Sequence, residues 1–127
     1  MSKLDLTRNF VPVKIAVLTI SDTRSLKDDK SGDLLVSKIT DAGHLVVKRE
    51  ITQDNIQKIK INLQQSIQDP DIDVVISTGG TGLTGRDVTP EAFRSMFDKE
   101  IEGFGELFRY ISFAKIGTST IQSRAVA

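Results

Sequence analysis

The chain has 127 residues, a length typical of one domain, and 39% apolar with 27% charged residues is the composition of a globular protein rather than a disordered or membrane-spanning one. Seventeen basic and 17 acidic residues cancel, so no broad positive field favours nucleic acid, and any attraction for a phosphorylated ligand has to be local. Without cysteine, disulfides, a thiolate nucleophile and cysteine-based zinc sites are excluded.

The first ten residues are polar and predict a loose N-terminal arm on a single domain that spans residues 1–127. The N-terminal residues 1–10 contain no apolar signal peptide core, and no apolar run in the sequence approaches the roughly 18 residues that a membrane-spanning helix needs. We therefore expect a cytoplasmic protein without a membrane partner.

Strands and helices alternate along the rest of the chain. Near-continuous β-branched runs are typical of strands that are buried on both faces of a parallel sheet. The order β-α-β-α-β-loop-α-α predicts an α/β fold in which helices cover both faces of a mostly parallel sheet. The predicted strands are 13–21, 44–52 and 73–78, and the predicted helices are 33–42, 55–68, 90–97 and 104–113.

Helix boundaries are predicted from capping residues. Ser31 and Asp54 are candidate N-caps of the first two helices, and Gly43 suits the position just after the first. Thr89 followed by Pro90 predicts the start of the third helix. In the second helix, the apolar residues share one face and predict its buried side: Ile56, Ile59, Leu63 and Ile67.

Ligands of open parallel sheets bind at the carboxyl ends of the strands. This rule points to loops 21–31, 52–54 and 78–89. The last of these contains Gly80-x-Gly82-x-x-Gly85, a literal match to the dinucleotide fingerprint. That fingerprint belongs after the first strand, with its third glycine already in a helix, and here it follows the third predicted strand ahead of Pro90. The order of the strands excludes a Rossmann loop.

The same glycine run allows two other interpretations. Backbone amides from Gly79 to Gly82, with the hydroxyls of Thr78 and Thr81, can form a concave anion-binding loop. A turn that only needs positive φ is the alternative, although one glycine would satisfy it. Asp54 and Asp87 also have two interpretations: each can serve its own turn or helix start, or together they can bind a divalent cation beside a substrate phosphate.

Five segments resemble the MoaB/MogA-like molybdenum cofactor biosynthesis family, and the similarity runs from residue 12 to residue 127. Their order agrees with the family, and the last segment is closer to MoaB than to MogA. The segments are ISDTR at 20–24, DKSG at 29–32, STGGTGLTGRDVTPEAF at 77–93, EIEGFGELFR at 100–109 and IGTSTIQSRAVA at 116–127.

The resemblance implies a three-layer α/β/α fold and a homo-oligomer, either a trimer or a hexamer. It implies a molybdopterin adenylyltransferase that transfers AMP from ATP to the molybdopterin phosphate with Mg²⁺ and passes its product to the molybdate-inserting enzyme. The alternative is a non-catalytic molybdopterin-binding or scaffold member of the pathway. Relatives continue with a further strand, a Pro-Gly-containing loop and a helix, so this C-terminal part of the family fold is expected to be absent here.

The resemblance also implies roles for particular residues. Asp54 and Asp87 match the acids of the family's active site, as catalytic residues and magnesium ligands. The matches to the substrate-binding positions are Thr78, Gly79, Gly80, Thr81, Gly82, Ser119 and Ser123. Arg86 is either a phosphate contact or a solvated loop charge. Glu106 either faces the pocket or pairs with Arg109 one helical turn away.

Overall fold

Strand β1 (Lys14–Ile20) is the middle strand of a three-stranded parallel sheet, flanked by β2 (Leu45–Thr52) and β3 (Val74–Thr78). The computed structural model describes residues 4–127. The sheet confirms the predicted parallel arrangement. Six of the seven residues of β1 are buried, because strands cover both its edges and helices cover both its faces.

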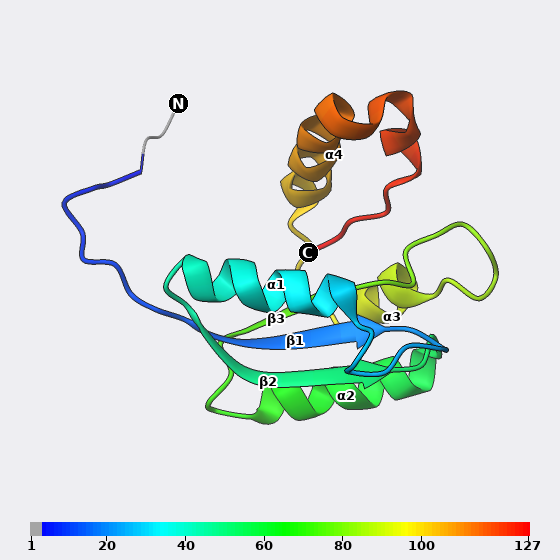
Figure 1. The fold of residues 1–127 in the computed structure, drawn as a ribbon, viewed down its shortest axis with the longest axis horizontal. Helices are drawn as coiled ribbons and strands as arrows, with labels where there is room; N and C mark the ends of the chain where they lie inside the picture. Colours follow the sequence, from blue (N-terminus) through cyan, green and yellow to red (C-terminus); the bar gives the residue numbers. More distant parts are fainter. Residues whose placement is uncertain (1–3) are drawn as a thin grey trace.

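Helices lie on both faces of the sheet and complete three layers (Figure 1). Helix α1 (Lys30–Asp41) packs on the face of β1 that carries Ile15 and Val17. Helices α2 (Ile56–Gln68) and α3 (Thr89–Arg94) pack on the opposite face. Alternate residues of β1 therefore supply two separate apolar cores, as the period of two along a strand requires.

The edge strand β3 is less buried than predicted. Strand β3 was expected to be fully buried, yet four of its five residues are half-buried and Val74 is exposed. The reason is its place at the edge of the sheet that residues 4–127 form. Helix α2 also buries less of its predicted apolar face. Ile59 and Leu63 are buried, whereas Ile56 is 39% and Ile67 62% exposed.

The predicted N-caps are wrong by one or two residues. Asp29, and not Ser31, caps α1, because its carboxylate accepts a hydrogen bond from the amide of Gly32 at 3.0 Å. Asn55, and not Asp54, caps α2 through the amide of Lys58 at 3.1 Å. The capping role therefore falls to a neighbour and leaves the Asp54 carboxylate available for other contacts.

The other boundaries differ less. Helix α3 begins with Thr89 rather than being capped by it, and Val88 stands at the cap without a side-chain hydrogen bond. The helix ends at Arg94, three residues before the predicted end. Gly43 has φ of 88° directly after the C-cap of α1, as predicted.

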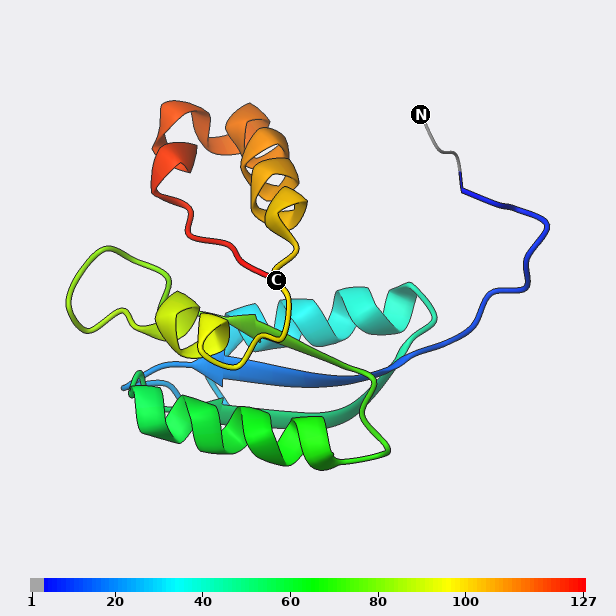
Figure 2. The same ribbon diagram turned by 180° about the vertical axis from the view of Figure 1, so that it is seen from behind.

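Helix α4 (Glu102–Ile116) and the short 3₁₀ helix η1 (Gly117–Gln122) stand apart from the three layers in both views (Figures 1 and 2). Helix α4 packs mainly on η1 and leaves many large apolar side chains exposed. Among residues 4–127, no helix combines the length and the apolar character that crossing a membrane requires.

The turn after β3 begins with a glycine that the fold requires. Gly79 has φ of 99°, and a Cβ at this position would overlap the carbonyl oxygen of Ile20 in β1. Neither the dihedral angle nor the contact can relax easily, because both involve backbone atoms. We expect Gly79→Ala to lower the free energy of unfolding by about 2–4 kcal/mol, measured by urea denaturation.

The matched control is Gly103→Ala in α4, where an added Cβ has no atom within 4 Å. This variant should be as stable as the wild type or slightly more stable, because alanine favours a helix. Equal stability of the Gly79→Ala variant and the wild type would show that the turn is not constrained in this way.

Candidate functional site

The three loops that the sequence placed at the carboxyl ends of the strands do meet. Asp22 follows β1, Asp54 follows β2 and Arg86 follows β3. The amide of Asp54 donates to Asp22 Oδ1 at 3.0 Å, and the Arg86 guanidinium forms an ion pair with the Asp22 carboxylate. The amide of Val88 donates to Asp54 Oδ1 at 3.1 Å. These hydrogen bonds connect all three loops at one end of the sheet.

The glycine loop turns sharply over this end. Gly80 follows Gly79 with φ of 63°, and its carbonyl accepts from the amide of Thr89 at 3.1 Å, which closes the loop from 80 to 89. Oγ1 of Thr89 is buried and has no hydrogen-bond partner within residues 4–127. A Cβ at Gly80 would overlap this hydroxyl. The unpartnered hydroxyl thus lies against the loop, where a ligand oxygen would satisfy it.

Two glycines of the loop leave room for the two candidate acids to approach its backbone. A Cβ at Gly80 would lie 2.9 Å from Asp54 Oδ2, and a Cβ at Gly82 would lie 2.6 Å from Asp87 Oδ2. Any larger residue at these positions would displace a carboxylate. The pattern Gly80-x-Gly82 therefore has a physical reason here that differs from the dinucleotide fingerprint, since each glycine makes room for an acid.

The environment of Asp54 disfavours its charge. Burial raises the pKa of its carboxyl, and the nearby carboxylates of Asp87 and Asp22 raise it further, while the amide of Val88 opposes this shift. Neighbouring acids that repel each other in this manner are typical of sites that bind a cation.

Asp87 has the opposite shift. Its Oδ2 accepts from the hydroxyl of Thr84 at 2.6 Å and from the amide of Thr84 at 3.1 Å. These hydrogen bonds, the hydroxyl first, lower the pKa of the Asp87 carboxyl. Asp87 thus stabilises its own turn. It remains ionised beside Asp54, whose carboxyl has a raised pKa.

The raised pKa of Asp54 leads to a prediction about stability. A carboxyl whose folded-state pKa lies above its unfolded value favours folding while protonated, and this contribution is lost as pH rises through the folded pKa. At neutral pH, Asp54→Asn should therefore raise the melting temperature, and the gain should vanish below the ordinary carboxyl pKa. Differential scanning calorimetry of both proteins across pH measures this difference.

The control for this prediction is Asp22→Asn. The ion pair with Arg86 and the amide of Asp54 lower the pKa of Asp22, so its loss should reduce stability at neutral pH. A lower melting temperature of the Asp54→Asn variant at neutral pH would show that its carboxylate is held by favourable contacts instead.

The predicted substrate-binding residues do not all gather at this site. Thr78 ends β3 and Thr81 lies exposed in the loop, so both stand next to the glycines. Ser123 is half-buried and directly precedes Arg124, whose side chain contacts the loop. Ser119 is exposed on η1, and no hydrogen bond within residues 4–127 joins it to the loop.

The two residues with open roles are now placed. Arg86 is paired with Asp22, although 75% of its side chain stays exposed. Glu106 is exposed, and within residues 4–127 it forms no ion pair with Arg109. Arg109 instead donates to the carbonyl of Ser123 at 3.1 Å, so of the two roles open to Glu106 the pair with Arg109 is not formed within residues 4–127.

The two acids at this site can supply only part of the ligand shell of a magnesium ion, and substrate oxygens would have to supply more of it. No group of three or more His, Asp or Glu side chains suited to a metal occurs in residues 4–127. Asp54 and Asp87 supply two carboxylates next to backbone amides and an unpartnered hydroxyl. Magnesium commonly takes one or two carboxylates and completes its shell with water and phosphate oxygens, so the donor set suits that ion.

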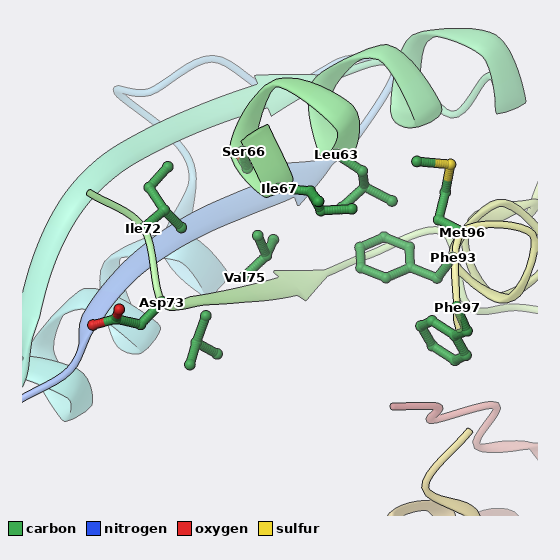
Figure 3. Close-up of a pocket in the computed structure, with 10 residues that line it drawn as sticks. Leu63, Ser66, Ile67, Ile72, Asp73, Val75, Phe93, Met96 and Phe97 are labelled. Carbon is green, nitrogen blue, oxygen red and sulfur yellow. The ribbon is translucent and has the colours of Figure 1, made fainter. Parts of the chain in front are cut away.

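An apolar groove lies elsewhere, along the edge strand β3 between α2 and α3 (Figure 3). Its volume is about 340 Å³, and none of the predicted site residues lines it. Its one acid, Asp73, accepts from the amide of Lys14 at 2.9 Å. A second hollow of about 480 Å³ beside the end of β2 is more polar and includes Asp22 of the candidate site.

Comparison with known proteins identifies relatives over nearly the whole chain. The model of the MoCF_biosynth family, described as "Probable molybdopterin binding domain", matches residues 16–126. Molybdenum cofactor biosynthesis protein B of Escherichia coli (strain K12) is 50% identical over 118 residues, which are 93% of this chain and 69% of the relative.

Solved structures agree with this match. A crystal structure of a molybdenum cofactor biosynthesis protein B superposes with a TM-score of 0.90 at 46% identity and covers 94% of this chain, which spans 74% of that protein. The tungsten cofactor synthesizing protein MoaB from Pyrococcus furiosus superposes with a TM-score of 0.76 at 36% identity, over 87% of this chain and 68% of its own. The three-layer fold is thus confirmed, and this chain is shorter than these neighbours.

Proposed function

Since the chain belongs to the MoCF_biosynth family and its relatives act in molybdenum cofactor biosynthesis, we propose that it is a molybdopterin adenylyltransferase. The reaction joins the terminal phosphate of molybdopterin to the α-phosphorus of ATP. A phosphate oxygen forms the new P–O bond, the bond to the β-phosphate bridge breaks, and pyrophosphate leaves.

One observation carries this proposal: two carboxylates approach a loop of backbone amides at the positions of Gly80 and Gly82. Phosphoryl and nucleotidyl transfer depend on positioning and on neutralising charge, and they need no covalent nucleophile from the protein. A chain without cysteine and with a single histidine, His44, whose Nδ1 accepts from the amide of Val13, suits that chemistry.

The residues of the site divide this work. The amides of residues 79–82 and the hydroxyls of Thr78, Thr81 and Thr89 would hold phosphate oxygens. Asp54 and Asp87 would hold magnesium, which neutralises developing charge on the transferred group when bound. The hydrogen bonds from Thr84 lower the pKa of Asp87, so this carboxylate keeps its negative charge at neutral pH.

Product formation tests the proposal. Purified protein is incubated with ATP, MgCl₂ and molybdopterin, and adenylylated molybdopterin and pyrophosphate are quantified by chromatography. Both products should accumulate in equal amounts. If no product forms while the same sample demonstrably binds molybdopterin, the adenylyltransferase proposal is wrong.

A second function, molybdopterin binding without catalysis, is favoured by the hydrogen bonds of Asp87. Its two bonds from Thr84 give the acid a role in the turn that needs no chemistry. Under this alternative, cells that carry Asp87→Asn would still make active molybdoenzymes. The adenylyltransferase proposal predicts that they lose these activities.

We also propose that copies of the chain assemble into a trimer or hexamer. The adenylylated molybdopterin that it forms would pass to the molybdate-inserting enzyme. The exposed apolar side chains of α4 support assembly, because large apolar side chains that gather on an exposed helix commonly mark protein interfaces. Sedimentation equilibrium should give three or six times the mass of the chain, and a monomer at micromolar concentration would contradict this proposal.

A further inference from the structure

One side chain connects the C-terminal segment to the glycine loop. Within residues 4–127, every hydrogen bond between segment 117–127 and residues 79–91, which are the glycine loop and the start of α3, is made by Arg124. This arginine lies 43 residues from Thr81 and 37 from Asp87 along the chain. Its side chain is 26% exposed, so most of it is packed against the loop.

The guanidinium makes three contacts in a fork. Its Nε donates to the carbonyl oxygen of Thr81 at 3.0 Å, and its Nη2 donates to the carbonyl oxygen of Asp87 at 2.8 Å. Nη1 forms an ion pair with the carboxylate of Glu91, which orients the plane of the guanidinium. The two carbonyl groups belong to the two ends of the segment 81–87.

The base of this loop is closed by the hydrogen bond from the amide of Thr89 to the carbonyl of Gly80, and Arg124 adds a side-chain link between its two ends. Residues 81–86 are exposed, and the contacts of Asp87 with Thr84 stay inside the loop. Arg124 bridges both ends, and a fixed separation of Thr81 and Asp87 keeps the Asp87 carboxylate against the space left by Gly82. A planar fork of five donors suits two carbonyls and a carboxylate, whereas an ammonium group makes a point contact.

We propose that Arg124 is a positioning residue that clamps loop 81–87. It thereby sets the distance between the backbone amides of residues 79–82 and the Asp87 carboxylate. The clamp itself is a property of the fold. Its effect on turnover rests on the proposed adenylyltransferase function. Arg124 contacts backbone atoms of the site and not the reacting groups, so its loss should slow the reaction more than it weakens substrate binding.

Hydrogen–deuterium exchange of peptides that span 79–88 tests the clamp without any substrate. We expect at least about tenfold faster exchange in Arg124→Ala, an intermediate change in Arg124→Lys and Glu91→Gln, and unchanged exchange in β1 and α2. The control is Arg94→Ala, since Arg94 pairs with Glu100 at 3.0 Å and, within residues 4–127, forms no hydrogen bond or ion pair with the loop. Wild-type exchange of the loop in both the lysine and glutamine variants would overturn the clamp, even if the alanine variant does not fold.

Steady-state kinetics test its consequence. In Arg124→Lys, kcat should fall by about tenfold to a hundredfold while KM for ATP changes less than about threefold, because a displacement near 1 Å has this effect on positioned groups. Wild-type turnover in the Arg124→Lys variant would mean that only the positive charge of residue 124 matters, and it would overturn the positioning role. If the wild type forms no adenylylated product, the proposed function fails, whereas the exchange result still decides whether Arg124 clamps the loop.

Discussion

Asp54→Asn and Asp87→Asn are each expected to lower kcat for AMP transfer by about a hundredfold or more, because each removes a charge that would hold magnesium and neutralise the transferred phosphate. Asparagine keeps the shape of the side chain and one oxygen acceptor. The hydrogen bond from the amide of Val88 to residue 54 can therefore persist, and the effect reports charge rather than misfolding.

The matched control is Glu106→Gln, since Glu106 is exposed on α4 and makes no ion pair within residues 4–127. Its kcat should equal that of the wild type. The double variant of Asp54 and Asp87 should be little slower than either single variant, because residues that act on one ion as a unit are not additive. Wild-type turnover in either single variant would remove that acid from the mechanism.

Gly82→Ala is expected to lower kcat by about a hundredfold without unfolding the protein. Its added Cβ would lie 2.6 Å from Asp87 Oδ2, so the carboxylate has to move, and a shift near 1 Å is enough for an effect of this size. Gly82 is not among the glycines with positive φ, so alanine is compatible with its backbone. Thermal unfolding should therefore change little while turnover falls.

Gly85→Ala is the control in the same loop. An added Cβ at Gly85 has no atom within 4 Å, and Gly85 also lacks positive φ. Its turnover should match that of the wild type. Equal losses in both alanine variants would point to general stiffening of the loop, and undiminished turnover in Gly82→Ala would show that Asp87 has no precise position to lose.

The sequence predicted the layout of the fold well, because that layout depends on local periodicity. The β-branched run of β1 indicated a strand covered on both faces, and the strand–helix alternation indicated a parallel sheet with three loops at one end. The meeting of Asp22, Asp54 and Arg86 follows from that topology. The partial exposure of β3 was missed because position within a sheet is set by pairing between distant strands.

The candidate site was predicted less completely. Asp54 was ambiguous in the sequence because any Asp before a helix can cap it. Only the structure shows that Asn55 takes that role. No role was predicted for Arg124, since its partners lie 33 to 43 residues away and no local pattern joins them. The spacing of Gly80 and Gly82 did carry a signal, but its cause is the room needed by two acids.

The central claim is that loop 79–87 holds the phosphate of molybdopterin between Asp54 and Asp87. A crystal structure of the protein with bound molybdopterin tests it most directly. With Mg²⁺ present, the terminal phosphate should lie within hydrogen-bond distance of the amides of residues 80–82, and the ion should lie between the phosphate and the two carboxylates. A phosphate bound in the apolar groove of Figure 3, or in the hollow beside β2 and away from this loop, would contradict the claim.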